Sequence, residues 1–334
     1  MPDIICLGEA LVDMVATTVG LSLVQAPGFT KAAGGAPTNV AAGCAVLGGS
    51  SGLIAKVGKD SFGEYLRQTL WDAGVDLEGF LLTDEYATQL AFVARDDRGV
   101  PDFAFHVKTS ADQALTPLDI DADYIRSGSV FHFGTITLIS EPARSATLRA
   151  LQIAEDEGLM ISLDPNLRPP LWPSLDDALT TMLEVVERCD FLKVSEEEME
   201  FLTGHVDLTR GLAALHDMGP VLVAVTRGPL GAAVFNGDVL LDLPAFRVPV
   251  VDTTGCGDAF VAAALVEMTG YDLDIADLGE SHLHDAFTFA SAAAAITATA
   301  EGAIPSLPGR EEVKELLAIG EWPWPPEADP LAMD

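Results

Sequence analysis

The sequence predicts a doubly wound α/β fold, in which a mainly parallel sheet is flanked by helices and carries a small β-sheet lid. Two observations predict it. Short apolar runs alternate with helical patterns over most of the 334 residues, as they do in parallel sheets covered on both faces. One stretch breaks this alternation with a hairpin pattern. We therefore expect residues 1–334 to form one domain with an inserted lid.

The predicted sheet consists of short buried strands. Each apolar run is followed by a polar or glycine-containing turn, which is typical of strands buried on both faces. The runs are residues 4–7, 130–133, 160–163, 191–194 and 221–225. Helical patterns at 141–157 and 196–202 lie between them, and Gly204 closes the second.

The predicted lid comes from two separate segments, about 13–35 and 86–112. Residues 89–95 and 102–107 flank the sequence Asp-Asp-Arg-Gly at 96–99, which favours an antiparallel hairpin. The extended-looking residues 21–31 complete a small separate sheet. Such a sheet can cover the carboxyl ends of the parallel strands, where α/β proteins bind ligands.

Composition excludes several classes of protein. The chain has 18 basic and 51 acidic residues and a formal charge of -33, which repels nucleic acid and anionic lipid. The charge-free stretch 32–55 is broken by glycines, so it predicts a loop and a packed helix and not a membrane span. Four scattered cysteines and an amino terminus without a basic leader favour a cytoplasmic location.

The segment 251–260, Val-Asp-Thr-Thr-Gly-Cys-Gly-Asp-Ala-Phe, carries the clearest chemistry. Gly255 and Gly257, with Cys256 between them, allow a tight turn at the start of a helix. The backbone N–H groups of such a turn point at one spot and favour an anion. Asp258 would face the same spot and could accept a proton from a hydroxyl group that attacks phosphorus. The alternative is an ordinary helix cap.

A second glycine pair indicates a ligand at the other end of the chain. Gly34 and Gly35 let a ligand approach the backbone, and Asn39 offers both a donor and an acceptor to a hydroxylated molecule. Upstream, Asp13 is predicted to end a strand with a carboxylate. A lone aspartate after a strand is usually a turn residue, so Asp13 gains weight only from its neighbours.

These segments together resemble the ribokinase-like (PfkB) family of carbohydrate kinases, and most closely its fructokinase branch. Residues 252–260 are similar to the carboxyl-terminal signature of the family and 33–41 to its amino-terminal signature. The resemblance implies that Asp258 is the catalytic base and that the turn of Gly255, Cys256 and Gly257 stabilises the transferring phosphoryl group. It implies sugar contacts for Asp13, Gly34, Gly35 and Asn39.

Cys256 departs from the alanine that is more usual in the signature. Cysteine and alanine both have small side chains, so the turn should stay intact. The cysteine nevertheless places a thiol among the N–H groups at the start of the helix. Such a thiol can be partly ionised and reactive. The alternative is an inert residue that packs beneath the turn, and the carboxylate of Asp258 favours it by opposing ionisation.

The resemblance also implies how ATP is bound. The D-P-N-x-R element of the family is matched by Asp164-Pro165-Asn166-Leu167-Arg168, with Arg168 near substrate or phosphate. A further family motif, V-G-x-D-x-x-G, is matched by Val57-Gly58 with Asp60 and Gly63. Residues 193–198 take the place of N-x-x-E, with serine replacing the usual asparagine, and 226–231 resemble the T-x-G-x-x-G nucleotide loop. The implied ATP-binding residues are Asn166, Lys193, Ser195, Glu198, Thr226, Gly228, Gly231 and Ser291.

Metal ions follow from the same resemblance. Glu198 is implied to order Mg²⁺ and the phosphates through water. Asp252 and Thr254, with the backbone near 302–308, lie where many family members hold a monovalent cation such as K⁺. Family members pair their lids across a two-fold axis, so the resemblance also implies a homodimer.

The sugar is predicted from residues 103–112, which resemble the fructokinase stretch that ends in S-A-D. Ketodeoxygluconate kinases carry an arginine here that pairs with the substrate carboxylate, and the alignment places Val107 at that position, or Lys108 if it slips by one. Losing that arginine favours a neutral sugar, so we expect fructose, with Lys108 near it. The alternatives are a 2-keto-3-deoxygluconate kinase, a riboside kinase and a catalytically silent sugar- or nucleotide-binding regulator.

Overall fold

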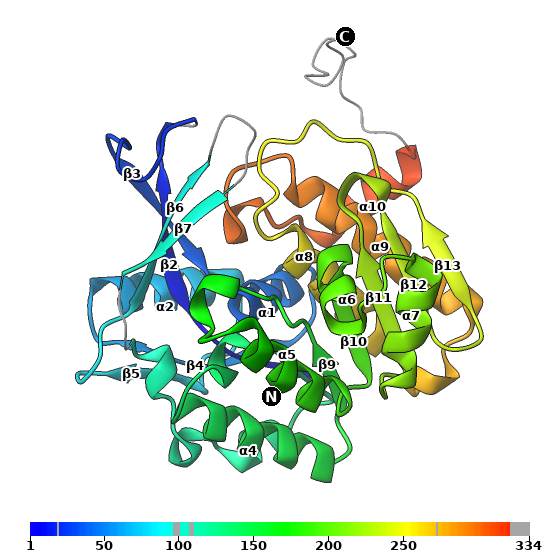
Figure 1. Cartoon of the computed structure of the whole chain (residues 1–334), viewed down its shortest axis with the longest axis horizontal. Coiled ribbons are helices and arrows are strands. Elements are labelled where there is room, and N and C mark those ends of the chain that lie inside the picture. The colour runs from blue at the N-terminus through cyan, green and yellow to red at the C-terminus, as the bar shows by residue number, and fades with distance from the viewer. Residues whose placement is uncertain (19, 96–100, 107–109, 272, 321–334) are drawn as a thin grey trace.

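A computed structural model describes residues 1–18, 20–95, 101–106, 110–271 and 273–320. Within these residues, the strands form a nine-stranded and a four-stranded sheet, and Figure 1 shows the smaller one standing beside the larger. None of the helices in the described part of the chain is long and apolar enough to cross a membrane. The predicted doubly wound α/β fold with a β-sheet lid is confirmed.

The larger sheet has the order β13-β12-β11-β10-β9-β8-β1-β4-β5. From β11 to β5 every neighbouring pair is parallel, whereas β12 and β13 are antiparallel. All five predicted core strands are present; β10 reaches one residue further than predicted, and β11 is shifted by one residue. The strands are β1 (Ile4–Leu7), β4 (Ser51–Gly58), β5 (Phe80–Thr83), β8 (Val130–Phe133), β9 (Met160–Leu163), β10 (Phe191–Ser195), β11 (Leu222–Thr226), β12 (Ala232–Phe235) and β13 (Leu240–Leu243).

Helices bury both faces of this sheet. In β1, Ile4 and Cys6 pack into one apolar cluster while Ile5 and Leu7 pack into the other, because successive side chains of a strand point to opposite faces. Apolar side chains from α1 (Ala36–Val46), α2 (Ser61–Ala73), α8 (Cys256–Thr269), α9 (Glu280–Thr297) and α10 (Arg310–Ile319) join the first cluster. Those of α3 (Ala122–Arg126), α4 (Ala143–Asp156), α5 (Leu175–Val186), α6 (Glu196–Thr203) and α7 (Leu208–Asp217) join the second.

The lid has the order β3-β2-β6-β7 and comes from the two predicted regions of the chain. Its strands are β2 (Leu11–Ala16), β3 (Phe29–Gly34), β6 (Gln89–Arg95) and β7 (Pro101–Phe105). Two details of the prediction were wrong. Residues 21–28 form turns and irregular backbone, so the strand begins at Phe29. Asp13 lies inside β2, where it pairs with Ala32 and Ala91, and does not end a strand. Residues 96–99 of the expected hairpin turn lie outside the described residues.

The chain order creates a binding edge at the carboxyl ends of the strands. From β1 the chain runs to β4 and β5 on one side and later to β8, β9, β10 and β11 on the other. The topological switch therefore lies between β1 and β8, which is where doubly wound sheets bind ligands. In Figure 1 the lid and the start of α8 lie at this edge.

Asp60 joins the lid to the main sheet. Its carboxylate caps α2 by accepting hydrogen bonds from the N–H groups of Phe62 (3.0 Å) and Gly63 (2.9 Å). It also accepts hydrogen bonds from the N–H group and the hydroxyl group of Thr88, both at 2.9 Å. Thr88 lies immediately before β6. Burial alone would raise the pKa of Asp60, but these hydrogen bonds outweigh it and lower the pKa.

We expect Asp60→Ala to lower the free energy of unfolding by about 2–3 kcal/mol, because a cap and two further hydrogen bonds are lost together. Urea denaturation at neutral pH measures it. Since the folded-state pKa is lowered, the stabilisation is present above the unfolded pKa and is lost as the pH falls through the folded value. Asp72→Ala, on the exposed side of the same helix, is the control and should change stability by less than about 0.5 kcal/mol. Equal effects would contradict the role of Asp60.

Candidate active site

The start of α8 forms the predicted anion-binding turn. Gly255, the N-cap, has φ 81° in the left-handed region, and a Cβ there would lie 2.6 Å from the Cβ of Ala303. A Cβ on Gly257 would lie 2.8 Å from the Nζ of Lys193. Glycine is therefore required at 255, whereas a side chain at 257 would have to displace the end of Lys193. The first N–H groups of α8 are left for an anion.

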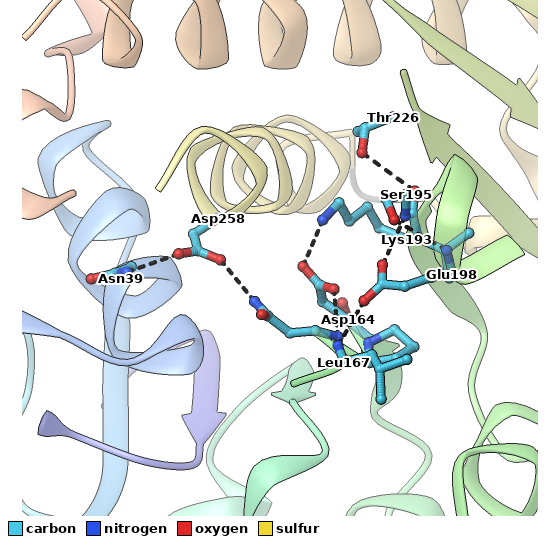
Figure 2. Close-up of polar contacts among 12 residues, drawn as sticks. Asn39, Asp164, Leu167, Lys193, Ser195, Glu198, Thr226 and Asp258 are labelled. Atoms are coloured by element: carbon cyan, nitrogen blue, oxygen red, sulfur yellow. Dashed lines mark hydrogen bonds and ion pairs between the residues drawn. The ribbon is translucent and has the colours of Figure 1, made fainter. Parts of the chain in front are cut away.

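Asp258 lies in the first turn of α8, between two side-chain amides. The Nδ2 of Asn39 donates to its Oδ2 at 2.8 Å, and the Nδ2 of Asn166 donates to its Oδ1 at 3.5 Å. Figure 2 shows Asn39 reaching Asp258 from α1. Burial, followed by the charge of Asp164, raises the pKa of Asp258 to about 6, against the opposing effects of Asn39, Lys193 and Arg168. This carboxylate is ionised, yet basic enough to accept a proton, near neutral pH.

A buried ion pair lies beside this carboxylate. The Nζ of Lys193 in β10 is 2.9 Å from Oδ2 of Asp164, which follows β9, and their side chains are 8% and 2% exposed. The other oxygen of Asp164 accepts the N–H of Asn166 at 3.1 Å. Asn166 has φ 47°, a conformation that asparagine tolerates better than most residues. The lysine thus lies beneath the anion-binding turn (Figure 2).

The predicted sugar-binding residues gather at the same edge. A Cβ on Gly34 would lie 2.2 Å from Oδ2 of Asp13, so the two residues are in close contact. Burial raises the pKa of Asp13 to about 7, and the nearby charge of Arg168 opposes this effect. Gly35 is the N-cap of α1, and the buried Oδ1 of Asn39 has no hydrogen-bond partner among the described residues. Lys108, the other predicted sugar residue, lies outside the described residues.

The predicted nucleotide-binding residues line the neighbouring strand ends. Ser195 caps α6 by accepting the N–H of Glu198 at 3.2 Å. The carboxylate of Glu198 accepts the N–H groups of Leu167 (2.7 Å) and Ser195 (2.8 Å) (Figure 2), so its position is fixed. Thr226 ends β11 and donates its hydroxyl group to the carbonyl of Val194 at 3.3 Å.

The remaining nucleotide candidates follow β11 or lie on α9. Gly228 and Gly231 bound a short 3-10 turn after β11. Ser291 lies on α9, and its buried hydroxyl group has no hydrogen-bond partner among the described residues. A polar atom of this kind is unfavourable in an apolar surrounding. Ser291 is therefore a candidate for contact with a ligand, although its neighbours are mostly alanine and phenylalanine.

Asp252 connects the two segments that the sequence assigns to a monovalent cation. One carboxylate oxygen accepts the N–H of Thr254 at 2.9 Å, and the other accepts the N–H of Gly302 at 3.0 Å. The described residues contain no group of three or more histidine, cysteine, aspartate or glutamate side chains that could hold a metal ion. Carboxylate, hydroxyl and carbonyl oxygens suit a hard cation, and Mg²⁺ commonly relies on water and substrate phosphates for most of its ligands.

Cys256 is half-buried as the first residue of α8. Burial raises the pKa of its thiol to about 12, and the charges of Asp252 and Asp258 act in the same direction. The helix-start N–H groups do not overcome these effects. Of the two hypotheses for this thiol, the structure therefore favours the inert one.

The sequence pattern described as pfkB family carbohydrate kinase matches residues 1–310. The chain belongs to this family. A probable chloroplastic fructokinase-6 from Arabidopsis thaliana is 44% identical over 318 residues, which are 95% of this chain and 82% of that protein.

Solved structures agree in fold. The fructokinase from Xylella fastidiosa with bound ATP superimposes with a TM-score of 0.87 and 28% identity, covering 96% of this chain and 99% of that one. A double mutant of the Vibrio cholerae O395 fructokinase with fructose, ADP and potassium ion bound gives a TM-score of 0.83 and 32% identity, covering 95% and 98% of the two chains.

Three polar residues in this pfkB family site had no role in the sequence analysis. Glu9 accepts the N–H of Ala36 at 2.8 Å, and burial raises its pKa to about 8. Asp112 and Gln89 each have a buried oxygen without a partner among the described residues. Glu9 lies four residues before Asp13, and Asp112 ends the Ser-Ala-Asp segment. Proximity to motif residues was therefore the available signal, but the burial of Glu9 and Asp112 is a tertiary property.

We expect kcat/KM for any proton transfer to Asp258 to fall on the acid side with an apparent pKa of about 6. The carboxylate must be ionised to accept a proton, so lowering the pH from 7 to 5 should reduce kcat/KM about tenfold. A pH series with stability checked at each point measures this. A rate that stays constant from pH 7 to pH 5 would contradict the assignment.

Proposed function

We propose that the protein transfers the γ-phosphoryl group of ATP to the 6-hydroxyl group of D-fructose, giving fructose 6-phosphate and ADP. The observation that carries this proposal is the position of Asp258, which accepts a hydrogen bond from Asn39 of the sugar segment and directly follows the anion-binding turn of residues 255–257. Support for fructose comes from the relatives at 41–44% identity that are described as fructokinases.

In this proposal, the sugar is held opposite the base. Asp13 and Asn39 bind hydroxyl groups of fructose, with the backbone at Gly34 and Gly35 close to the ring. Asp258 takes the proton of the 6-hydroxyl group as its oxygen attacks the γ-phosphorus atom. The bond to the oxygen that bridges the β- and γ-phosphates breaks, and ADP leaves with that electron pair.

The phosphoryl group is proposed to be stabilised by the turn at 255–257 and by local positive charge. The N–H groups of the turn donate to its oxygens, where charge develops in the transition state. Arg168 adds a cation near both Asp13 and Asp258, since its charge lowers the pKa of each. These local groups offset the overall charge of -33.

The nucleotide and ions are assigned by position. Asn166, Lys193, Ser195, Thr226, Gly228, Gly231 and Ser291 are proposed to contact ATP. Mg²⁺ would neutralise the phosphates and be ordered through water by Glu198, whose carboxylate is fixed in place. K⁺ would be held by Asp252, Thr254 and nearby carbonyl groups, a proposal supported by the potassium ion in the description of the Vibrio cholerae protein. Lys108 remains a proposed sugar contact on sequence grounds alone.

The lid is further proposed to form a homodimer, with residues 1–334 as one domain in the cytoplasm. One face of the lid carries the rings of Phe29, Phe92 and His106, with centroids 5.2 and 5.9 Å apart in successive pairs. This face is opposite to the one that carries Asp13, because Asp13 pairs with Ala91 while Phe92 is its neighbour. A second lid can cover such rings and the edges of a small sheet.

Replacing the base tests the reaction. We expect Asp258→Asn to lower kcat for fructose by about two to four orders of magnitude, with ATP affinity changed less than threefold or so, because an amide cannot accept the proton. A coupled ADP-release assay compares fructose, ketodeoxygluconate, ribose and nucleosides as acceptors. Asp285→Asn, on the exposed surface of α9, is the control and should retain wild-type turnover. Near-normal turnover of Asp258→Asn, or no preference for fructose, would overturn the proposal.

Light scattering on an eluting column peak tests the dimer. At micromolar concentration we expect twice the chain mass of 35.2 kDa. Ala104→Asp places a charge on an exposed lid position that pairs with Phe92, so it should weaken the dimer without removing packing inside the monomer. Leu118→Asp, at a position 97% exposed and outside the lid strands, is the control. A wild-type protein that elutes only as monomer would rule out the lid dimer.

A further inference from the structure

Lys193 occupies an unusual position for a nucleotide-binding lysine. Its Nζ lies under the anion-binding turn, 2.8 Å from the point where a Cβ on Gly257 would be. The nucleotide loop, in contrast, follows β11 at Gly228 and Gly231. Figure 2 shows the lysine side chain running below the first turn of α8 toward Asp164. The absence of a side chain at Gly257 leaves the ammonium group directly beneath the place where the turn would hold an anion.

The ion pair with Asp164 fixes the ammonium group there. The two charged atoms are 2.9 Å apart, and neither side chain is more than 8% exposed. Burying such a pair costs several kcal/mol per ion in lost hydration, so it is weak as a source of stability. The two charged side chains also have little conformational freedom, because they come from neighbouring parallel strands, β9 and β10. Leu163 precedes Asp164 and pairs with Leu192, which precedes Lys193. The pair therefore has a precise geometry that stability alone does not explain.

The local charges favour a lysine that remains protonated. Burial alone would lower the pKa of Lys193, but the charges of Asp164, Glu198 and Asp258 raise it above the ordinary value. Three carboxylates thus surround one ammonium group before any phosphate arrives. A transferring phosphoryl group adds more negative charge at the same place. Among the described residues, the cation that contacts the turn is Lys193.

We propose that Lys193 is a catalytic residue that contacts the transferring phosphoryl group through the opening at Gly257, and that Asp164 is the positioning residue that holds its ammonium group there. This inference rests on the proposed kinase function and adds to the proposed ATP contact of Lys193 a main contribution in the transition state, where the lysine matters more than it does for the affinity of ground-state ATP. Lys193 keeps its proton throughout. The proton of the sugar hydroxyl group goes to Asp258, and the electron pair of the broken P–O bond leaves with ADP.

The two members of the pair also shift the pKa of the proposed base, Asp258, in opposite directions. The charge of Asp164 raises the pKa of Asp258, whereas that of Lys193 lowers it. Other charged or titratable groups also interact with this carboxylate: Glu9, Asp13, Arg168 and Cys256. These groups are the same in every variant below, so a difference between variants reports the pair alone.

Two single variants test the proposal. Lys193→Met should lower kcat about a hundred- to a thousandfold while the Kd of ATP changes less than about fivefold, since the interaction is made mainly in the transition state. It should also move the acid limb of kcat/KM to higher pH. Asp164→Asn should lower kcat about ten- to a hundredfold through misplacement of the ammonium group, and should move the acid limb to lower pH. Opposite shifts of the limb are a result that a purely structural role would not produce.

A matched control separates chemistry from folding. Lys56 and Asp119 form another lysine–aspartate pair, also 2.9 Å apart and largely buried at 15% and 23% exposure. Lys56→Met should reduce thermal stability but keep kcat within about threefold, because this pair is not in the active site. If Lys193→Met does not fold, the double variant with Asp164→Asn removes both charges and avoids an unpaired buried carboxylate. It should fold and show the same loss of kcat.

Each outcome decides the inference separately from the proposed function. If kcat of Lys193→Met is unchanged and only the Kd of ATP rises, the lysine binds the ground state and the inference is wrong. If the acid limb of kcat/KM lies at the same pH in the two single variants, the positioning role of Asp164 is wrong. If the wild-type protein shows no sugar-dependent ADP release, the proposed function fails instead.

Discussion

The buried pair of Lys193 and Asp164 is the interaction around which the carboxyl edge of the sheet is organised. The parallel register of β9 and β10 brings the two residues together, and Asp164 shapes the following loop by accepting the N–H of Asn166. That loop in turn is tied to α6, because Leu167 donates its N–H group to Glu198. The start of α8 lies against this unit at Gly257, where a Cβ would be 2.8 Å from the Nζ of Lys193. One ion pair therefore fixes the relative positions of four elements.

Electrostatics explains why this pair must be buried and precise. A chain with a formal charge of -33 repels a polyphosphate at long range. Exposed lysines would be screened by salt and by neighbouring carboxylates, whereas charges held in a low-dielectric site act strongly over short distances. The same low dielectric raises the pKa of Asp258 to about 6 and that of Asp13 to about 7. Burial thus raises the basicity of Asp258, while the charges of Asp164, Glu198 and Asp258 keep Lys193 protonated against the effect of its own burial.

Prediction from the sequence succeeds for features set by neighbouring residues and fails for features set by contacts in the folded chain. The core strands were predictable because continuous apolar runs such as 4–7 are a local property. The start of β3 was not, because Thr30 and Lys31 give a strand that is partly exposed and recognisable only by its partner β2. Motifs in the sequence also singled out Asn39 and Asp258 as candidates, but not the hydrogen bond between them. The pairing of Asp164 with Lys193, the burial of Glu9 and Asp112 and the raised pKa of Cys256 depend on which groups fold together, which no spacing in the sequence reveals.

Two side-chain amides hold Asp258 from opposite sides of the site. Asn39 comes from α1, next to the glycines of the sugar segment, and its Nδ2 is 2.8 Å from one carboxylate oxygen. Asn166 comes from the loop that Asp164 holds, and its Nδ2 is 3.5 Å from the other oxygen. The first bond is short and the second is at the limit of hydrogen bonding. In the proposed reaction, a sugar that engages Asn39 would act on one oxygen of Asp258, and a phosphate beside Lys193 would act on the other through Asp164 and Asn166. Under the proposed function, the orientation of the base would therefore depend on the sugar side and the phosphate side together, which would favour proton transfer when both substrates are in place.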